Sequence, residues 1–157
     1  MKHLYWLSDG EWARIEPEEG YFSQAALDHY QRCIDGCLER GVMPIPTLHH
    51  FTQPLWQAKN GGFNDRGFSD RFARFCERTA GALNGFPYAC TFNELNLPLF
   101  VGQMLKGLFD GERGAALKTA AEAALDAPIA NVFFFSPPEA ILDQGLKAHA
   151  RGRDAIK

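Results

Sequence analysis

The sequence has no apolar run of the roughly 20 residues that a membrane-spanning helix requires, and it has no excess of basic residues. Its 16 Lys and Arg against 19 Asp and Glu give a formal net charge of −3, which removes the electrostatic basis for binding nucleic acid or an anionic membrane. The start of the chain, MKHLYWLSDGEW, breaks its apolar stretch with acidic residues and is not typical of a signal peptide. We therefore expect a cytoplasmic protein whose partners are neither nucleic acids nor membranes.

The cysteines argue against two further classes of protein. No CxxC pair occurs among Cys33, Cys37, Cys76 and Cys90, whereas a structural zinc site needs tightly clustered ligands and a disulfide scaffold is typical of shorter secreted chains. A free cysteine usually packs as a small hydrophobic residue. We expect reduced structural thiols, with no metal and no cofactor.

What the sequence does contain is the composition of one soluble globular domain over residues 1–157, with 46% hydrophobic and 22% charged residues. Strands are predicted at residues 3–8, 42–51 and 88–94, and helices at residues 23–41, 68–83, 112–125 and 138–157. The first of these helices has Ser23 as a candidate N-cap and Gly41 as a candidate stop. The second strand, VMPIPTLHHF, is expected to be buried on both faces.

The order of strands and helices predicts an α/β fold with parallel strands joined by crossover helices. Polar residues follow two of the predicted strands directly: His49 and His50 end one, and Asn93 and Glu94 end the other. In parallel sheets the functional residues collect beyond the carboxyl ends of the strands. The sequence therefore predicts a functional site where these two pairs lie together.

Three motifs that occur in order resemble those of glycoside hydrolase family 1, the β-glucosidase family. They are EWARIEPEEG, TLHHFTQPLW and TFNELN, and a Gly-Gly-aromatic sequence follows the second of them. The resemblance extends from about Glu11 to Lys157. It implies a partial TIM (β/α)₈ barrel and a retaining hydrolysis that uses two glutamates.

The resemblance also implies roles for five residues. Glu94, which follows an asparagine at a strand end, matches the family's acid/base glutamate. Asn93, His50, Phe51 and Trp12 match substrate-binding positions, although Phe51 stands where the family usually has tryptophan. The chemistry agrees, because a general acid needs a partly desolvated carboxyl group and an adjacent amide can bind the sugar 2-hydroxyl. The expected substrate is a β-glycoside or an oligosaccharide.

Structural interpretations of the same residues stay open. Glu94 could be a helix-capping or ion-paired carboxylate, and His50 could be a packed histidine held by hydrogen bonds. Trp12 and Trp56 could fill space in the core, which is the interpretation we favour for Trp56. We expect His49 to face away from the site and pack, and because adjacent strand residues point to opposite faces, the two histidines do not predict a metal site.

The sequence also departs from the family pattern. Leu95 replaces the proline that normally follows Asn-Glu, and the earlier segment HLYWLSDG has no counterpart of an arginine that supports the family's site. A complete barrel needs about 250 residues. The family's nucleophilic glutamate lies in a later Thr-Glu-Asn-Gly-like motif, which does not occur here, and Glu11 and Glu16 are the other carboxylates near a predicted strand end.

Two functions are therefore open. The chain is expected to be a β-glucosidase-like hydrolase by descent, with Glu94 as acid/base and the nucleophile absent from these residues. The alternative is a non-catalytic remnant, or a subunit whose barrel is completed by a partner, that binds only sugar or protein. A partial barrel leaves strand edges unpaired, so self-association is expected. The aromatic run Phe133–Phe135 is a candidate to cover part of the exposed surface, and it could equally be local core.

Overall fold

A computed structural model describes residues 11–105 and 107–157, and the strand expected at residues 3–8 lies outside this part of the chain. The elements are, in order, α1 (Glu11–Ile15), α2 (Gln24–Leu38), β1 (Thr47–His49), α3 (Leu55–Lys59), η1 (Gly62–Asn64), α4 (Phe68–Ala82), β2 (Cys90–Phe92), α5 (Leu97–Met104), α6 (Gly111–Leu125), η2 (Ile129–Asn131), η3 (Phe133–Phe135), α7 (Pro138–Ala140), η4 (Ile141–Gly145) and α8 (Leu146–Ala155). The three segments η1 to η3 are short 3-10 helices, and η4 is a π-helical turn between α7 and α8. The helices expected at residues 68–83, 112–125 and 138–157 are thus confirmed.

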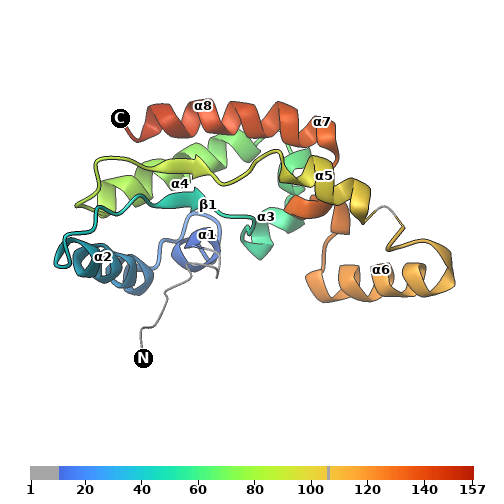
Figure 1. Ribbon diagram of the computed structural model, residues 1–157. Coiled ribbons are helices and arrows are strands. Elements are labelled where there is room, and N and C mark those ends of the chain that lie inside the picture. Colours follow the sequence, from blue (N-terminus) through green and yellow to red (C-terminus); the bar gives the residue numbers. More distant parts are fainter. Residues whose placement is uncertain (1–10, 106) are drawn as a thin grey trace.

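The two strands form a parallel pair, as predicted, with Thr47 opposite Cys90 and His49 opposite Phe92. The chain crosses from β1 to β2 through α3 and α4 (Figure 1). Within the described residues the sheet has only these two strands and does not close into a barrel. The fold is therefore α/β with a parallel sheet and crossover helices, and the sheet is open.

Both strands are much shorter than expected. In the expected strand 42–51 the structure assigns only Thr47–His49, and Val42, Met43 and Ile45 are each at least 50% exposed. Burial on both faces was therefore wrong for its first half. The physical reason is the proline pair in VMPIP, because a proline has no N–H to donate to a neighbouring strand. The Pro46 carbonyl still accepts a hydrogen bond from the Cys90 N–H at 2.8 Å, and pairing begins there.

Helix α2 begins and ends close to where its sequence signals place it. The Ser23 hydroxyl accepts from the Ala26 N–H, and this N-cap contact was expected from the residue type. After Leu38 the chain reverses at Gly41, which has a φ of +69° that glycine adopts without steric cost. The N–H of Val42 then bonds back to the Cys37 carbonyl at 2.9 Å, and this closes the helix end.

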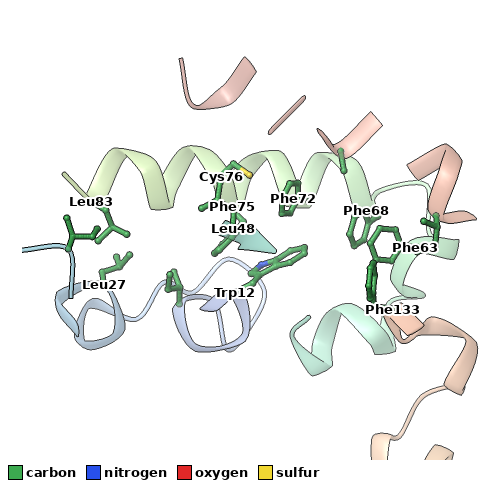
Figure 2. Close-up of a cluster of buried hydrophobic side chains, with 14 residues drawn as sticks. Trp12, Leu27, Leu48, Phe63, Phe68, Phe72, Phe75, Cys76, Leu83 and Phe133 are labelled. Carbon is green, nitrogen blue, oxygen red and sulfur yellow. The ribbon is translucent and has the colours of Figure 1, made fainter. Parts of the chain in front are cut away.

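The core lies between α4 and the strands, and α8 runs along α4 on the other side (Figure 1). The buried face of α4 is aromatic: Phe68, Phe72 and Phe75 recur at helical spacing and are fully buried. Figure 2 shows Trp12 near the middle of this cluster, with Leu27 and Leu83 toward one end and Phe63 and Phe133 toward the other.

Two segments were assigned less well from sequence. The turn-rich region before Gly20 contains helix α1, which buries Trp12 and Ile15. The passage between β2 and α7 contains α5, η2 and η3 in addition to the expected α6. Phe133 of η3 is fully buried in the aromatic cluster, which agrees with the interpretation of this residue as local core. No described helix combines the length and hydrophobicity needed to cross a membrane.

Candidate active site at the strand ends

The parallel register brings the two polar pairs to the same end of the sheet. His49 lies opposite Phe92, and the Asn93 N–H donates to the His49 carbonyl at 2.9 Å, so the strands stay paired up to that point. His50 and Asn93 are the next residues to leave the sheet, and Glu94 follows Asn93. The structure thus joins residues that are more than 40 positions apart at one rim, which comprises His50, Phe51, Asn93 and Glu94.

Glu94 is an exposed residue in the turn between β2 and α5. Its carbonyl accepts a hydrogen bond from the Leu97 N–H at 2.8 Å, which starts α5. Among the described residues no hydrogen bond or ion pair to its carboxylate is formed, so the alternative of an ion-paired structural carboxylate finds no partner there. The carboxyl group is therefore available to a ligand at the rim.

The backbone at this rim is unusual. Only three described non-glycine residues have a positive φ, and two of them are Phe51 at +66° and Glu94 at +44°. An L-residue in this region carries a steric cost of about 1–2 kcal/mol. Such costs are concentrated at binding and catalytic sites, where the surrounding structure enforces a particular side-chain direction. Both strands therefore end in a strained turn on the same side of the sheet.

His50 and Phe51 form one aromatic unit at the end of the sheet that also carries Glu94. Both are half-buried, and their rings meet edge to face with centroids 4.6 Å apart. The ring of Phe51 packs in turn on Phe133 at 5.9 Å and on Phe134 at 5.3 Å. Asn93 is also half-buried. A binding surface at this rim would thus combine an imidazole, an amide and a carboxylate on an aromatic base.

His49 has the opposite environment. It is 1% exposed, and described aromatic rings surround it with centroids within 6.3 Å, those of Trp12, Phe63, Phe72, Phe92 and Phe133. Neither ring nitrogen has a hydrogen-bond partner within the described structure. Burial lowers the pKa of His49 to about 3, so the ring is neutral at neutral pH. The expectation that His49 packs is confirmed, and among the described residues no group of three or more metal-ligating side chains is present.

Trp12 does not lie on this rim. The indole is 1% exposed and stacks on Phe75 with centroids 5.2 Å apart, and its Nε1–H donates to Glu16 Oε2 at 2.8 Å. This position favours the packing interpretation over contact with a sugar. Trp56 is half-buried against Trp12 and donates to the Glu16 carbonyl at 2.8 Å, as expected for a residue of the core.

Glu16 is a structural carboxylate that the sequence did not identify as one. It is fully buried and accepts from Trp12, from the Gly20 N–H at 2.8 Å and from Arg74 Nη2 at 2.6 Å. Both oxygens are therefore engaged, and Glu16 is not available as a nucleophile. The spacing of four residues between Trp12 and Glu16 is a local signal that was not used, whereas the Arg74 partner lies 58 positions away and left none.

Comparison with known proteins decides the family. The sequence profile described as Glycosyl hydrolase family 1 matches residues 5–132. The chain belongs to glycosyl hydrolase family 1. Among curated members of that family, the chain is 31% identical over 113 residues to 6-phospho-beta-galactosidase 1 of Streptococcus pneumoniae, and 34% identical over 91 residues to cytosolic beta-glucosidase of Homo sapiens. These alignments cover 71% and 55% of this chain but 24% and 19% of the relatives.

Solved β-glycosidase structures have a similar fold. Beta-glycosidase BGL167 is 41% identical with a TM-score of 0.77, and beta-glucosidase 1317 is 33% identical with a TM-score of 0.80. The matches cover 93% and 94% of this chain, against 36% and 37% of those structures. The structural relatives are TIM-barrel glycosidases, and this family 1 chain spans about a third of their length and about a quarter of the curated relative from Streptococcus pneumoniae.

Proposed function

We propose that the rim of β1 and β2 is the glycone-binding and acid/base part of a retaining β-glycosidase site, with Glu94 as the acid/base. The observation that carries the proposal is the parallel register, which brings His50, Asn93 and Glu94 to one end of the sheet in a family 1 chain. His50 and Asn93 are assigned to sugar hydroxyl groups, and Phe51 forms the apolar base beside them. Trp12 is left out of this assignment because it is buried in the core.

Retaining hydrolysis proceeds in two displacements and needs two carboxyl groups about 5–5.5 Å apart. In the first, a carboxylate attacks the anomeric carbon while the Glu94 carboxyl group gives its proton to the departing glycosidic oxygen. In the second, the Glu94 carboxylate takes a proton from water as the water oxygen replaces the enzyme carboxylate at the anomeric carbon. Glu16 is held in the core by structural contacts. The family's Thr-Glu-Asn-Gly-like motif does not occur in the sequence, so the proposal places the nucleophile in a part of the barrel that these residues do not include.

The substrate class proposed is a β-glycoside or β-linked oligosaccharide. The curated relatives carry the names of β-glucosidases and 6-phospho-β-galactosidases, so the sugar could be neutral or phosphorylated. One of them is named a cytosolic enzyme, which agrees with the cytoplasm as the proposed location. A non-catalytic sugar-binding or partner-completed barrel segment is the second candidate, and it is favoured by the engagement of both Glu16 oxygens in structural contacts.

A chimera tests the acid/base assignment. Residues 11–157 would replace the matching segment of beta-glycosidase BGL167, to which the chain is 41% identical. Glu94→Gln in the chimera is expected to lower kcat/KM for alkyl β-glucosides by about 10²–10⁴-fold, because a poor leaving group needs proton transfer. The loss should be much smaller for dinitrophenyl β-glucoside, whose leaving group needs no proton. Rates are measured by glucose or phenolate release.

Two controls accompany the chimera. Glu139→Gln changes another exposed glutamate on α7 and is expected to leave the rate unchanged. The isolated 157-residue chain is expected to hydrolyse aryl β-glucosides no faster than its own Glu94→Gln variant, because it has no nucleophile. An active chimera that is indifferent to Glu94→Gln with every leaving group would overturn the assignment, and turnover by the isolated chain that depends on Glu94 would show that it contains its own nucleophile.

A further inference from the structure

A segment distant in sequence from both strands is fixed to the loop that follows β1. Asn131, which ends η2, is 9% exposed, and its side-chain amide donates to the Ala58 carbonyl at 2.9 Å. Asn64 donates to the Asn131 Oδ1 at 3.2 Å, and Gln53 donates to the Asn131 carbonyl at 2.8 Å. Every one of these partners lies at least 67 positions away from Asn131. The side chain and backbone of Asn131 thus hold residues 131–135, here called the clamp segment. They hold it against residues 50–67, which connect β1 to α4, include α3 and η1, and are here called the loop after β1.

The approach between the two segments is close enough to require glycine. Gly62 has a φ of +55°, and a Cβ on it would lie 2.0 Å from the Asn131 carbonyl oxygen. The Gln57 side chain is buried below the same loop and donates to the Gly62 carbonyl. The position of Asn131 is therefore fixed from several sides, and the clamp segment has little freedom relative to β1.

The aromatic side chains of the clamp segment lead from Asn131 to the rim. Phe133 is fully buried and lies 5.2 Å from His49 and 5.9 Å from Phe51, centroid to centroid. Phe134 lies 5.3 Å from Phe51, and Phe51 meets His50 at 4.6 Å. The ring of Phe51 is thus held between the clamp segment and His50, at a residue whose backbone is in the left-handed region.

The clamp segment also reaches the other strand end. It packs against α5, the helix that begins directly after the turn carrying Glu94. Phe135 contacts Phe109, which follows α5, with ring centroids 5.4 Å apart. One short run of three phenylalanines therefore touches the segments that follow both β1 and β2.

We propose that the clamp segment is a positioning element of the site: Asn131 fixes Phe133 and Phe134, and these fix the ring of Phe51 and with it the imidazole of His50 relative to Glu94. The inference rests on the proposed function for the role of His50 in sugar binding, but the placement of the ring is a property of this chain alone. In this proposal the clamp residues act through Phe51 and not by contacting the substrate. Their effect is to hold the side chains of the rim in one arrangement, although the backbone at Phe51 and Glu94 is strained.

The placement can be measured without activity, by NMR of the five histidines. The ring current of Phe51 is expected to change the chemical shifts of the His50 ring protons. The signals that disappear in His50→Gln are thereby assigned to His50. Asn131→Ala and Phe133→Leu are each expected to shift the His50 ring signals, because Phe51 loses its support and turns away. Phe134→Leu, at a half-buried residue, gives the same test should Asn131→Ala fail to fold.

Leu27→Ala is the matched control. It removes a core side chain at the end of the cluster opposite Phe133 (Figure 2), so it lowers stability without touching the rim. It is expected to leave the His50 signals in place. If the folded clamp variants also leave them in place, or if Leu27→Ala shifts them equally, the inference is overturned. Indifference of the chimera to Glu94→Gln would overturn the proposed function instead and leave the His50 measurement standing.

Discussion

At the scale of single residues, two adjacent histidines have different physical states. His50 sits half-buried at the rim, whereas His49 is enclosed by aromatic rings that offer it no conventional hydrogen-bond acceptor. Leaving a polar ring unpaired in an apolar site costs free energy. That cost is lower for the neutral ring than for the charged one, and this difference gives the folded chain a specific sensitivity to acid.

Folding stability is expected to fall as the pH drops below about 6.5. The pKa of His49 is about 3 in the folded chain against 6.5 for a free histidine, so between these values the unfolded state binds a proton that the folded state does not. The stability associated with the neutral ring is complete above pH 6.5 and declines by about 1.4 kcal/mol per pH unit below it, down to about pH 3. Urea unfolding at pH 7.5 and 5.0 should show a loss of about 2 kcal/mol from this site.

His49→Phe is the matched control for this prediction. It keeps an aromatic ring among the neighbouring rings and removes the titrating group, so the variant should lose about 2 kcal/mol less than the native chain between the two pH values. The comparison is of the two pH dependences, not of the absolute stabilities. An equal pH dependence in both proteins would show that His49 is accessible to protons in the folded state.

At the scale of elements, the contact between α4 and α8 depends on a glycine. Gly152 in α8 is buried, and a Cβ there would lie 3.0 Å from Cys76 Sγ and 3.1 Å from a ring carbon of Phe72. These two side chains belong to the buried face of α4 and have little room to move. In contrast, a Cβ at Gly81 near the end of α4 would meet nothing within 4 Å. Two helical glycines thus differ in what surrounds them.

Alanine at these two positions is expected to have opposite effects. Gly81→Ala should raise the free energy of unfolding by about 0.5–1 kcal/mol, because alanine loses less conformational entropy in a helix. Gly152→Ala should lower it by about 1–3 kcal/mol, because the added methyl group forces α8 away from α4. Thermal or urea unfolding of the two variants beside the native chain measures both. A stabilising Gly152→Ala would mean that the two helices pack less tightly than the structure shows.

At the scale of the whole molecule, the described elements do not all pack into one compact layer. Figure 1 shows α6 standing apart from the layer formed by α4, α8 and the strands. Gly114 is the buried residue of α6, and an exposed ion pair between Lys59 and Asp126 links the end of this helix to α3. Large apolar side chains are exposed before both strands, with Val42, Met43 and Ile45 ahead of β1 and Tyr88 ahead of β2.

The purified chain is expected to self-associate and to bind a hydrophobic dye in dilute solution. One of the exposed residues, Ile45, lines an apolar cavity of about 240 Å³ together with Ile34 and Leu48. Within the described residues β1 and β2 are paired only with each other. Exposed apolar patches and unpaired strand edges both recruit other chains. Light scattering after size exclusion, together with dye fluorescence, measures the effect.

The double variant Met43→Lys with Ile45→Lys is the control for the surface. Since both side chains are at least half exposed, the charges should reduce association and dye binding without unfolding the chain. A monodisperse native chain that binds no dye and unfolds cooperatively would contradict the prediction. Such a result would favour a stand-alone module that has sealed its own edges.

The sequence by itself determined the features that depend on neighbours in the chain. The spacing of Phe68, Phe72 and Phe75 predicted α4, and the Ser23 cap predicted the start of α2. The strand-helix order predicted the parallel pair, and three short motifs predicted the family. These features follow from helix and strand periodicity, capping and crossover rules, which act over a few residues or on the order of elements.

Only the tertiary structure decided which of these residues face solvent and which partners they have. Sequence assigned Trp12 to the site and placed Glu16 near a functional strand end, but both lie in the core, where Arg74 comes from another element. It predicted strands of seven and ten residues at 88–94 and 42–51, and the structure pairs only Cys90–Phe92 with Thr47–His49. The hydrogen bonds that join Asn131 to the loop after β1 could not be predicted from neighbouring residues, because their partners lie at least 67 positions away. The reason is that burial and polar pairing are fixed by segments that meet only after the chain has folded, so no window of neighbouring residues contains them.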